Sequence, residues 1–183
     1  MTMTATYSYN TGPVLALPGG IFTIPAEFQI DKQSTSIADT GTYVITVTIS
    51  DDFPASFTST FTLSITNAVP RVATVPEDVS LVHGSSLSIP LTSNFVDDDG
   101  DPLTMEATYS LNGGAAVSIS GGIFALLPPF TIVAASQGLV DVGAYTISVS
   151  VSDSLSSVTT SFTLIITNTS PRLVSTPLAV TAP

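Results

Sequence analysis

One short segment concentrates the side chains that could bind a cation. It is Asp97-Asp98-Asp99-Gly100-Asp101, a run of carboxylates on a glycine-containing turn. Calcium takes roughly six to eight oxygen ligands, and closely spaced aspartates can supply several of them. The alternative is a solvated turn in which aspartate and glycine serve only the backbone geometry. The glutamate that closes an EF-hand loop does not occur at the required spacing, so this segment is not an EF-hand.

Catalytic chemistry finds little support. The chain has no cysteine, which excludes disulfides, thiolate metal sites and cysteine nucleophiles. The sole histidine, His83, lies in a turn between two expected strands, where we expect it to be exposed to solvent. Nothing distinguishes any one serine as its partner, and no second carboxylate is placed for acid–base work. We therefore expect that the chain is not an enzyme.

Composition excludes two classes of partner. Lys and Arg together number 3 against 14 Asp and Glu, for a net charge of −11. Binding to nucleic acid requires a basic surface that displaces counterions, and contact with an anionic membrane surface requires one too. No apolar run reaches the length of a membrane span. We expect neither nucleic-acid binding nor membrane insertion.

An internal repeat organises the chain. Met1–Ser8 matches Leu103–Ser110 at an offset of 102 residues, and Phe61–Asn67 matches Phe162–Asn168 at an offset of 101. A repeat of this length is typical of one small domain. The chain therefore holds one domain-sized unit, seen nearly twice.

Within each copy, apolar and polar residues alternate. The alternation is clearest in two runs of the second copy, whose apolar members are Leu103, Met105, Ala107, Tyr109 and Leu111, and then Tyr145, Ile147, Val149 and Val151. This period of two is typical of antiparallel strands with one buried and one solvated face. Clusters of Gly, Pro, Asn and Asp separate the runs, and no stretch has a helical period. The sequence predicts an all-β fold.

The motif Asp-x-Gly-x-Tyr occurs once in each copy, at Asp39–Tyr43 and Asp141–Tyr145. It resembles the tyrosine corner that opens a late strand of immunoglobulin-like Greek keys. Where an antibody-type domain has cysteine two residues after the tyrosine, this chain has Ile45 and Ile147. We expect apolar packing to replace an inter-sheet disulfide there.

A longer pattern resembles the dystroglycan-type cadherin-like repeat. The segments that carry the resemblance are Phe95–Thr104, Val142–Asp153 and Phe162–Asn168, within a match that covers 70–169 and the later motifs of 1–68. The resemblance implies two tandem Ig-like (cadherin-like) Greek-key β-sandwiches in an extracellular or cell-surface array, sometimes stiffened by calcium. It also implies the calcium ligands, which are Asp97, Asp99, Asp101 and Asp153. No other cofactor is expected.

The repeat also predicts the domain boundaries. We divide the chain into an incomplete first sandwich over 1–69, a complete second one over 70–170 and a C-terminal β-segment over 171–183. The second copy begins with two strands, expected near Val72–Leu81 and Leu87–Leu91, and about thirty residues of this part have no counterpart in the first copy. A sandwich without such strands exposes its apolar inner face and unpaired backbone groups.

Two interpretations of the last segment stay open. Residues 171–183 repeat the opening of the second copy, including its Pro-Arg pair. In the first interpretation they donate a strand to another copy through Leu173, Leu178 and Val180 and build a head-to-tail filament. In the second, the chain is a window on a longer tandem protein, and neighbouring repeats of the same chain supply the strands.

These features predict a structural subunit of an extracellular fibril or surface filament. The alternative is a fragment of a long cell-surface adhesion protein with cadherin-like repeats. An adhesion module would present an exposed aromatic cluster or a charged patch, and the sequence offers only Tyr9, which replaces Leu111 of the other copy. Asn168-Thr169-Ser170 is a glycosylation sequon, so glycans are a further expected partner.

Overall fold

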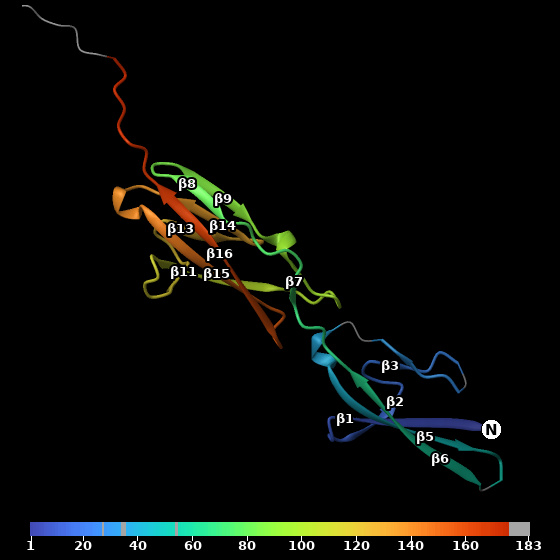
Figure 1. Cartoon of the computed structure of the whole chain (residues 1–183). Coiled ribbons are helices and arrows are strands. Elements are labelled where there is room, and N and C mark those ends of the chain that lie inside the picture. The colour runs from blue at the N-terminus through green and yellow to red at the C-terminus, as the bar shows by residue number, and fades with distance from the viewer. Residues whose placement is uncertain (27, 34–35, 54, 176–183) are drawn as a thin grey trace, which may run out of the picture. The chain divides into compact units, whose positions relative to one another are not determined.

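The structure is a computed structural model that describes residues 1–26, 28–33, 36–53 and 55–175 (Figure 1). The chain divides into two compact units. Unit 1 comprises Met1–Ala68 and Asp98–Asp101. Unit 2 comprises Val69–Asp97 and the chain from Pro102 onward.

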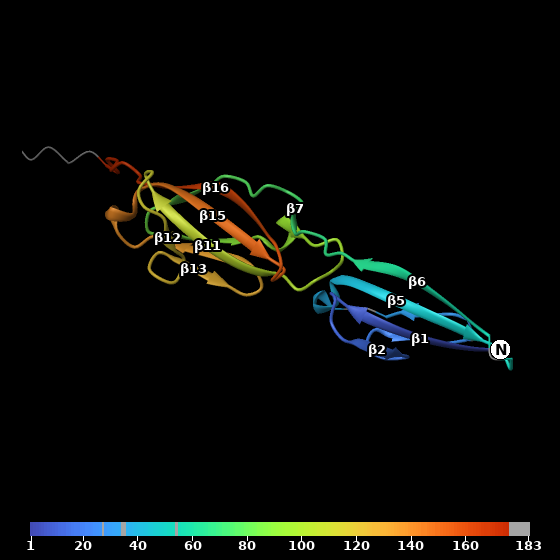
Figure 2. The same cartoon turned by 90° about the horizontal axis from the view of Figure 1, so that it is seen from below.

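Unit 2 is a sandwich of two main sheets (Figure 2). Its strands in these sheets are β8 (Val79–Val82), β9 (Ser86–Pro90), β11 (Thr104–Leu111), β12 (Val117–Ser118), β13 (Phe124–Leu127), β14 (Thr131–Ala135), β15 (Gly143–Ser152) and β16 (Ser157–Thr167). The larger sheet has the order β12-β11-β15-β16-β8, and the smaller one has the order β13-β14-β9. Neighbouring strands are antiparallel except β16 and β8, which are parallel.

The alternation expected from the sequence is present in β15. Its buried side chains are Tyr145, Ile147, Val149 and Val151. Phe124 and Ile132 from the smaller sheet belong to the same buried cluster. Burial of each large apolar side chain contributes roughly 1.5–3 kcal/mol, so this core can hold the two sheets together without a disulfide. The prediction of an all-β fold is confirmed.

Unit 1 repeats part of this arrangement. Its strands are β1 (Thr2–Tyr9), β2 (Val14–Leu17), β3 (Phe22–Thr23), β4 (Asp31–Lys32), β5 (Gly41–Ser50) and β6 (Ser56–Ile65). One sheet has the order β2-β1-β5-β6, and β3 pairs with β4 in a second sheet. Figure 2 shows β1, β5 and β6 side by side. By the repeat offset, β1 corresponds to β11, β5 to β15 and β6 to β16.

Two strands of the main sheets of unit 2 have no counterpart among the described residues of unit 1. In unit 2, β8 extends the larger sheet beyond β16, and β9 extends the smaller sheet beyond β14. In the described part of unit 1, the larger sheet ends at β6 and the second sheet holds only β3 and β4. One layer of this sandwich is therefore a narrow ribbon.

Both Asp-x-Gly-x-Tyr motifs form the expected corner. The hydroxyl of Tyr43 donates a hydrogen bond to the carbonyl oxygen of Asp39 at 2.9 Å. The hydroxyl of Tyr145 donates in the same way to the carbonyl oxygen of Asp141 at 2.8 Å. The prediction of two tyrosine corners is confirmed, and each one ties the start of a long central strand to the turn before it.

Packing at the corner explains the glycine of the motif. A Cβ atom on Gly41 would lie 2.5 Å from Cε2 of Tyr9, which is closer than real side chains approach. Two residues beyond each tyrosine, Ile45 and Ile147 are buried in the cores of their units. Apolar packing at these positions is confirmed.

The expected single strand over Val72–Leu81 is wrong. Two short strands replace it, β7 (Arg71–Val72) and β8, and they have different partners. β7 pairs with β10 (Phe95–Val96), whereas β8 pairs with β16. Pro76 lies between them, and proline has no N–H group to donate to a strand ladder. The second expected strand, Leu87–Leu91, is confirmed as β9.

Helices are confined to short turns in the described residues. They are the 3-10 helices η1 (Ile37–Asp39), η2 (Thr92–Asn94) and η3 (Leu139–Asp141). Across the described residues, none of the helices has the length and apolar character needed to cross a bilayer.

Candidate interaction face and cation site

An apolar face of unit 1 is open to solvent. It is formed by the inward side chains of β5 and β6, and we call it the acceptor face. Its residues are Val47, Ile49, Phe57, Phe61, Leu63 and Ile65. Phe57 is 69% exposed and Phe61 is 49% exposed, and the other four are half-buried. At the equivalent positions of unit 2, Phe162 is 4% exposed and Leu164 is fully buried.

Two strands and the turn after them cover these positions in unit 2. The buried side chains that do so are Leu81, Ile89, Leu91 and Phe95, which share one core with β15 and β16. Their counterparts do not occur among the described residues of unit 1. The acceptor face is therefore exposed because its cover is absent there, although β6 and β16 have nearly the same apolar pattern.

The backbone edge of β6 is equally open. In unit 2 the corresponding edge of β16 pairs with β8 from Leu164 to Thr167. The carboxylate of Asp78 extends this contact by accepting a hydrogen bond from the backbone N–H of Thr163 at 2.6 Å. No strand in the described part of the chain pairs with the outer edge of β6. Such an edge is a template for a further strand.

The C-terminal segment is exposed as far as the structure describes it. Residues 168–175 are all exposed, with Leu173 at 74% and Val174 at 90%. The other two predicted assembly residues, Leu178 and Val180, lie outside the described residues. Asn168 is exposed, as a glycan acceptor must be.

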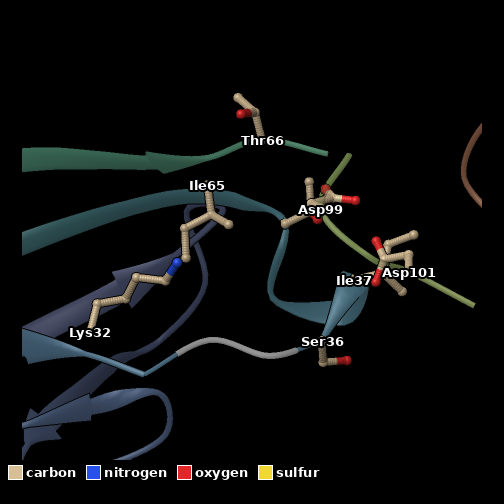
Figure 3. A pocket seen from close by; sticks show the side chains of 8 residues that line it. Lys32, Ser36, Ile37, Ile65, Thr66, Asp99 and Asp101 are labelled. Atoms are coloured by element: carbon tan, nitrogen blue, oxygen red, sulfur yellow. The ribbon is translucent and has the colours of Figure 1, made fainter. Parts of the chain in front are cut away.

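The acidic turn brings three of the predicted cation ligands together. One carboxylate oxygen from each of Asp97, Asp99 and Asp101 lies within 4.8 Å of the other two. Asp99 also has a structural contact, because its Oδ2 accepts a hydrogen bond from the backbone N–H of Ala68 at 2.8 Å. Figure 3 shows Asp99 and Asp101 at one side of a pocket of unit 1 that Lys32 also lines.

The donor set of this turn suits calcium. Carboxylate oxygens are the hard ligands that calcium prefers, and a calcium–oxygen distance of about 2.3–2.6 Å places opposite ligands about 5 Å apart. The largest separation among the three oxygens, 4.8 Å, is within that span. Backbone carbonyls or water would complete the coordination, because three carboxylates alone do not fill it.

Asp153 lies outside this group of three. It is buried, and its Oδ1 accepts hydrogen bonds from the backbone N–H groups of Leu155 and Ser156 at 2.8 and 2.7 Å. Its Oδ2 accepts a third from Ser156 Oγ at 2.9 Å. These contacts hold the turn between β15 and β16, so the structure gives Asp153 a part in the fold.

Comparison with known proteins places the chain in a family. The profile of one family, described as the bacterial Ig domain, matches residues 67–167. The chain belongs to the bacterial Ig domain family. The match spans the strands of unit 2, and unit 1 carries the same pattern through the internal repeat. No curated protein matches the chain.

Several solved structures of tandem Ig fragments are similar to this bacterial Ig domain chain. They include Sidekick-1 immunoglobulin domains 1–5 (16% identity, TM-score 0.44), an I-band fragment of titin (13%, 0.43) and Drosophila OTK extracellular domains 3–5 (11%, 0.42). The alignments cover 91%, 90% and 90% of this chain. The chain spans 33% of the Sidekick-1 chain, 55% of the titin chain and 51% of the OTK chain.

In this bacterial Ig domain chain, the expectation that His83 is exposed is wrong. His83 is half-buried, and its Nδ1 lies 3.3 Å from Ser136 Oγ. Ser136 Oγ in turn donates a hydrogen bond to Asp141 Oδ2 at 3.4 Å. The serine lies between the other two, whereas a catalytic triad places the histidine in the middle. The three residues tie the β8–β9 turn to the segment before β15.

The role of Ser136 is not apparent from the sequence, because nothing distinguishes it from the many other serines of the chain. It is buried, and the carboxylate beside it is also held by the backbone. Asp141 Oδ2 accepts hydrogen bonds from the N–H groups of Gly138 and Gln137 at 2.9 and 2.8 Å. These bonds to Gly138 and Gln137 lower the pKa of Asp141, with smaller contributions from Ser136 and His83.

The placement of Tyr9 points to packing. Its hydroxyl donates a hydrogen bond to the carbonyl oxygen of Thr40 at 2.8 Å. Its ring centre lies 4.9 Å from that of Tyr43. Tyr9 therefore supports the corner of unit 1, and this use explains its presence without a ligand.

Proposed function

We propose that this chain is a structural subunit of an extracellular fibril or surface filament built from tandem Ig-like domains. Copies join head to tail by strand donation, in which residues 171–183 of one copy complete unit 1 of the next. The observation that carries this proposal is the exposed acceptor face beside the open edge of β6. No catalytic step is part of the proposed function.

Burial of the acceptor face supplies a driving force for assembly. Phe57 and Phe61 are the two most exposed of its six side chains, and full burial of a large apolar side chain contributes roughly 1.5–3 kcal/mol. A donated strand also pairs the backbone groups along β6, as β8 does along β16. A contact between the tail of one copy and the head of another does not close on itself, so it propagates as a filament.

The charge of the chain makes a prediction about conditions. Each copy carries a net charge of −11, so copies repel one another at low ionic strength. Added salt screens this repulsion, since the Debye length falls to about 8 Å at physiological ionic strength. Assembly through an apolar face should therefore increase as salt is raised.

Electron microscopy and sedimentation of the purified chain test the proposal. The full chain should form filaments or a ladder of oligomers, and a truncated chain ending at residue 170 should not. A matched pair of variants locates the contact: Phe61→Asp on the acceptor face should abolish assembly, and Thr62→Asp on the opposite face of β6 should preserve it. Unchanged filaments from the truncated chain would contradict strand donation.

The second candidate is a segment of a long cell-surface adhesion protein. The tandem repeat favours it, because the strands that cover the acceptor face could then come from a neighbouring repeat of the same chain. Residues 171–183 also contain no counterpart of β9. Dispersed, monomeric particles of the full chain would favour this candidate over the filament.

We also propose that Asp97, Asp99 and Asp101 hold calcium, as in arrays that the ion stiffens. The mutual oxygen distances within 4.8 Å support this proposal. Asp153 is a weaker candidate ligand, because both of its oxygens already accept hydrogen bonds from its own turn. Asn168 remains a candidate glycan acceptor, which mass spectrometry of the intact chain would test.

A further inference from the structure

Unit 2 contains the template for the strand that unit 1 can accept. There β8 lies parallel to β16, with Val79 opposite Leu164 and Leu81 opposite Ile166. β6 matches β16 at an offset of 101 residues, so Leu63 is the equivalent of Leu164. The pairing of β8 with β16 therefore predicts the direction and register of a strand that completes unit 1.

The C-terminal segment matches the β7–β8 region at that same offset. Its two prolines, Pro171 and Pro177, keep the spacing of Pro70 and Pro76. Val180 then stands where β8 has its first residue. The segment that the repeat places against β6 is thus a second copy of the segment that lies against β16.

Resting on the proposed function, we infer that the strand donated by a second copy runs parallel to β6 with Val180 opposite Leu63 and Ala182 opposite Ile65. In β8 the third residue, Leu81, is buried and the second, Ser80, is exposed. The donated strand keeps this pattern, because an apolar residue alternates with the outward Thr181. A shift by one residue would turn the threonine onto the acceptor face.

Two differences make the donated strand a weaker partner than β8. Ala182 takes the place of Leu81, so it fills less of the space above Ile65. Ala179 takes the place of Asp78, whose carboxylate accepts a backbone hydrogen bond from β16. The variant Ala182→Leu restores the larger side chain and should tighten assembly by roughly tenfold or more, because it adds three apolar carbon groups to the buried contact.

Disulfide cross-linking tests the register, because the chain has no cysteine of its own. Adjacent strands lie about 4.8 Å apart, which is within the Cα separation that a disulfide spans. A chain with Ser64→Cys is mixed with a chain with Thr181→Cys, oxidised, and analysed on a non-reducing gel. Both positions face away from the acceptor face, so the substitutions leave the apolar contact intact.

A second pair of mixtures tests the direction. If the strands are parallel, Thr62→Cys cross-links to Ala179→Cys. If they are antiparallel about the same centre, Thr66→Cys cross-links to Ala179→Cys instead. A third mixture, Ser64→Cys with Ser80→Cys, detects exchange of β8 between copies.

The expected result is a cross-linked dimer from the first mixture and from the Thr62→Cys mixture alone of the direction pair. Oligomers that lack these cross-links, or that form the Thr66→Cys product, overturn the register and leave the proposed assembly in place. The Ser80→Cys product would show that β8 is exchanged between copies, which overturns both the register and donation by residues 171–183. Full chains that stay monomeric in sedimentation overturn both the register and the proposed function. Failure of the two proposals is therefore distinguishable.

Discussion

Phe61 and Phe162 occupy equivalent positions in β6 and β16, yet Phe61 is 49% exposed and Phe162 is 4% exposed. The residues around them along the chain are nearly the same. The difference lies in β8 and β9, which cover Phe162 and have no counterpart in the described part of unit 1. The same kind of side chain is therefore part of the core in unit 2 and partly exposed in unit 1.

Alanine at these two positions should affect two different properties, the stability of the monomer and its assembly. Phe162→Ala should destabilise unit 2 by about 3–5 kcal/mol, because it leaves a cavity in a packed core. Phe61→Ala should change the unfolding free energy of the monomer by less than about 1 kcal/mol but weaken assembly. Urea unfolding of dilute protein and sedimentation of concentrated protein check the two effects. A large loss of monomer stability in Phe61→Ala would show that its ring is core after all.

The stability that the tyrosine corner of unit 2 contributes should be lost at alkaline pH. Tyr145→Phe removes the hydrogen bond to Asp141 and should cost about 1 kcal/mol at neutral pH. Burial raises the pKa of Tyr145, and the nearby Asp141 carboxylate raises it further. The stability from the neutral hydroxyl is present below the ordinary tyrosine pKa of about 10 and is lost as pH rises through the higher folded pKa. The gap between wild type and variant should therefore narrow in alkaline urea titrations, and a constant gap would contradict this.

The stability that the Asp141 carboxylate contributes should be lost in acid. Its pKa is lowered by the backbone N–H groups of Gly138 and Gln137, so the contribution of its carboxylate is present above the ordinary aspartate pKa of about 3.9. That contribution is lost as pH falls through the folded pKa. Asp141→Asn should lower the urea midpoint at neutral pH and approach wild type in strong acid. Glu106→Gln, at an exposed residue of β11, is the control and should leave the urea midpoint at neutral pH unchanged.

Calcium should raise the melting temperature if the acidic turn binds it. A site at a hundredfold excess of free ion over its dissociation constant stabilises by about 2.7 kcal/mol. Asp99→Asn should remove this calcium-dependent shift, and Asp98→Asn, whose carboxylate is not in the group of three, should preserve it. Thermal melting with calcium and with chelator checks both variants. Identical curves for the wild type in the two solutions would contradict a structural ion.

Much of the fold could be predicted because its signals are local or repeated. Alternation in β15 and the two tyrosine corners depend on residues close in sequence, and both are confirmed. The proximity of Asp97, Asp99 and Asp101 follows from their place in one turn. By contrast, the contact between His83 and Ser136 joins segments far apart in sequence, and neither residue has a local pattern that announces it.

The sequence by itself determined the strand pattern, the repeat and the corner motifs, since these depend on short-range backbone geometry and on side-chain periodicity. Only the tertiary structure decided which apolar strands are covered. The Phe-Thr-Leu-x-Ile-Thr-Asn segments of β6 and β16 have the same periodicity, but burial depends on β8 and β9. The tertiary structure also decided the break at Pro76, before which β7 pairs with β10 and after which β8 pairs with β16. Strand partners are chosen by packing across the sandwich.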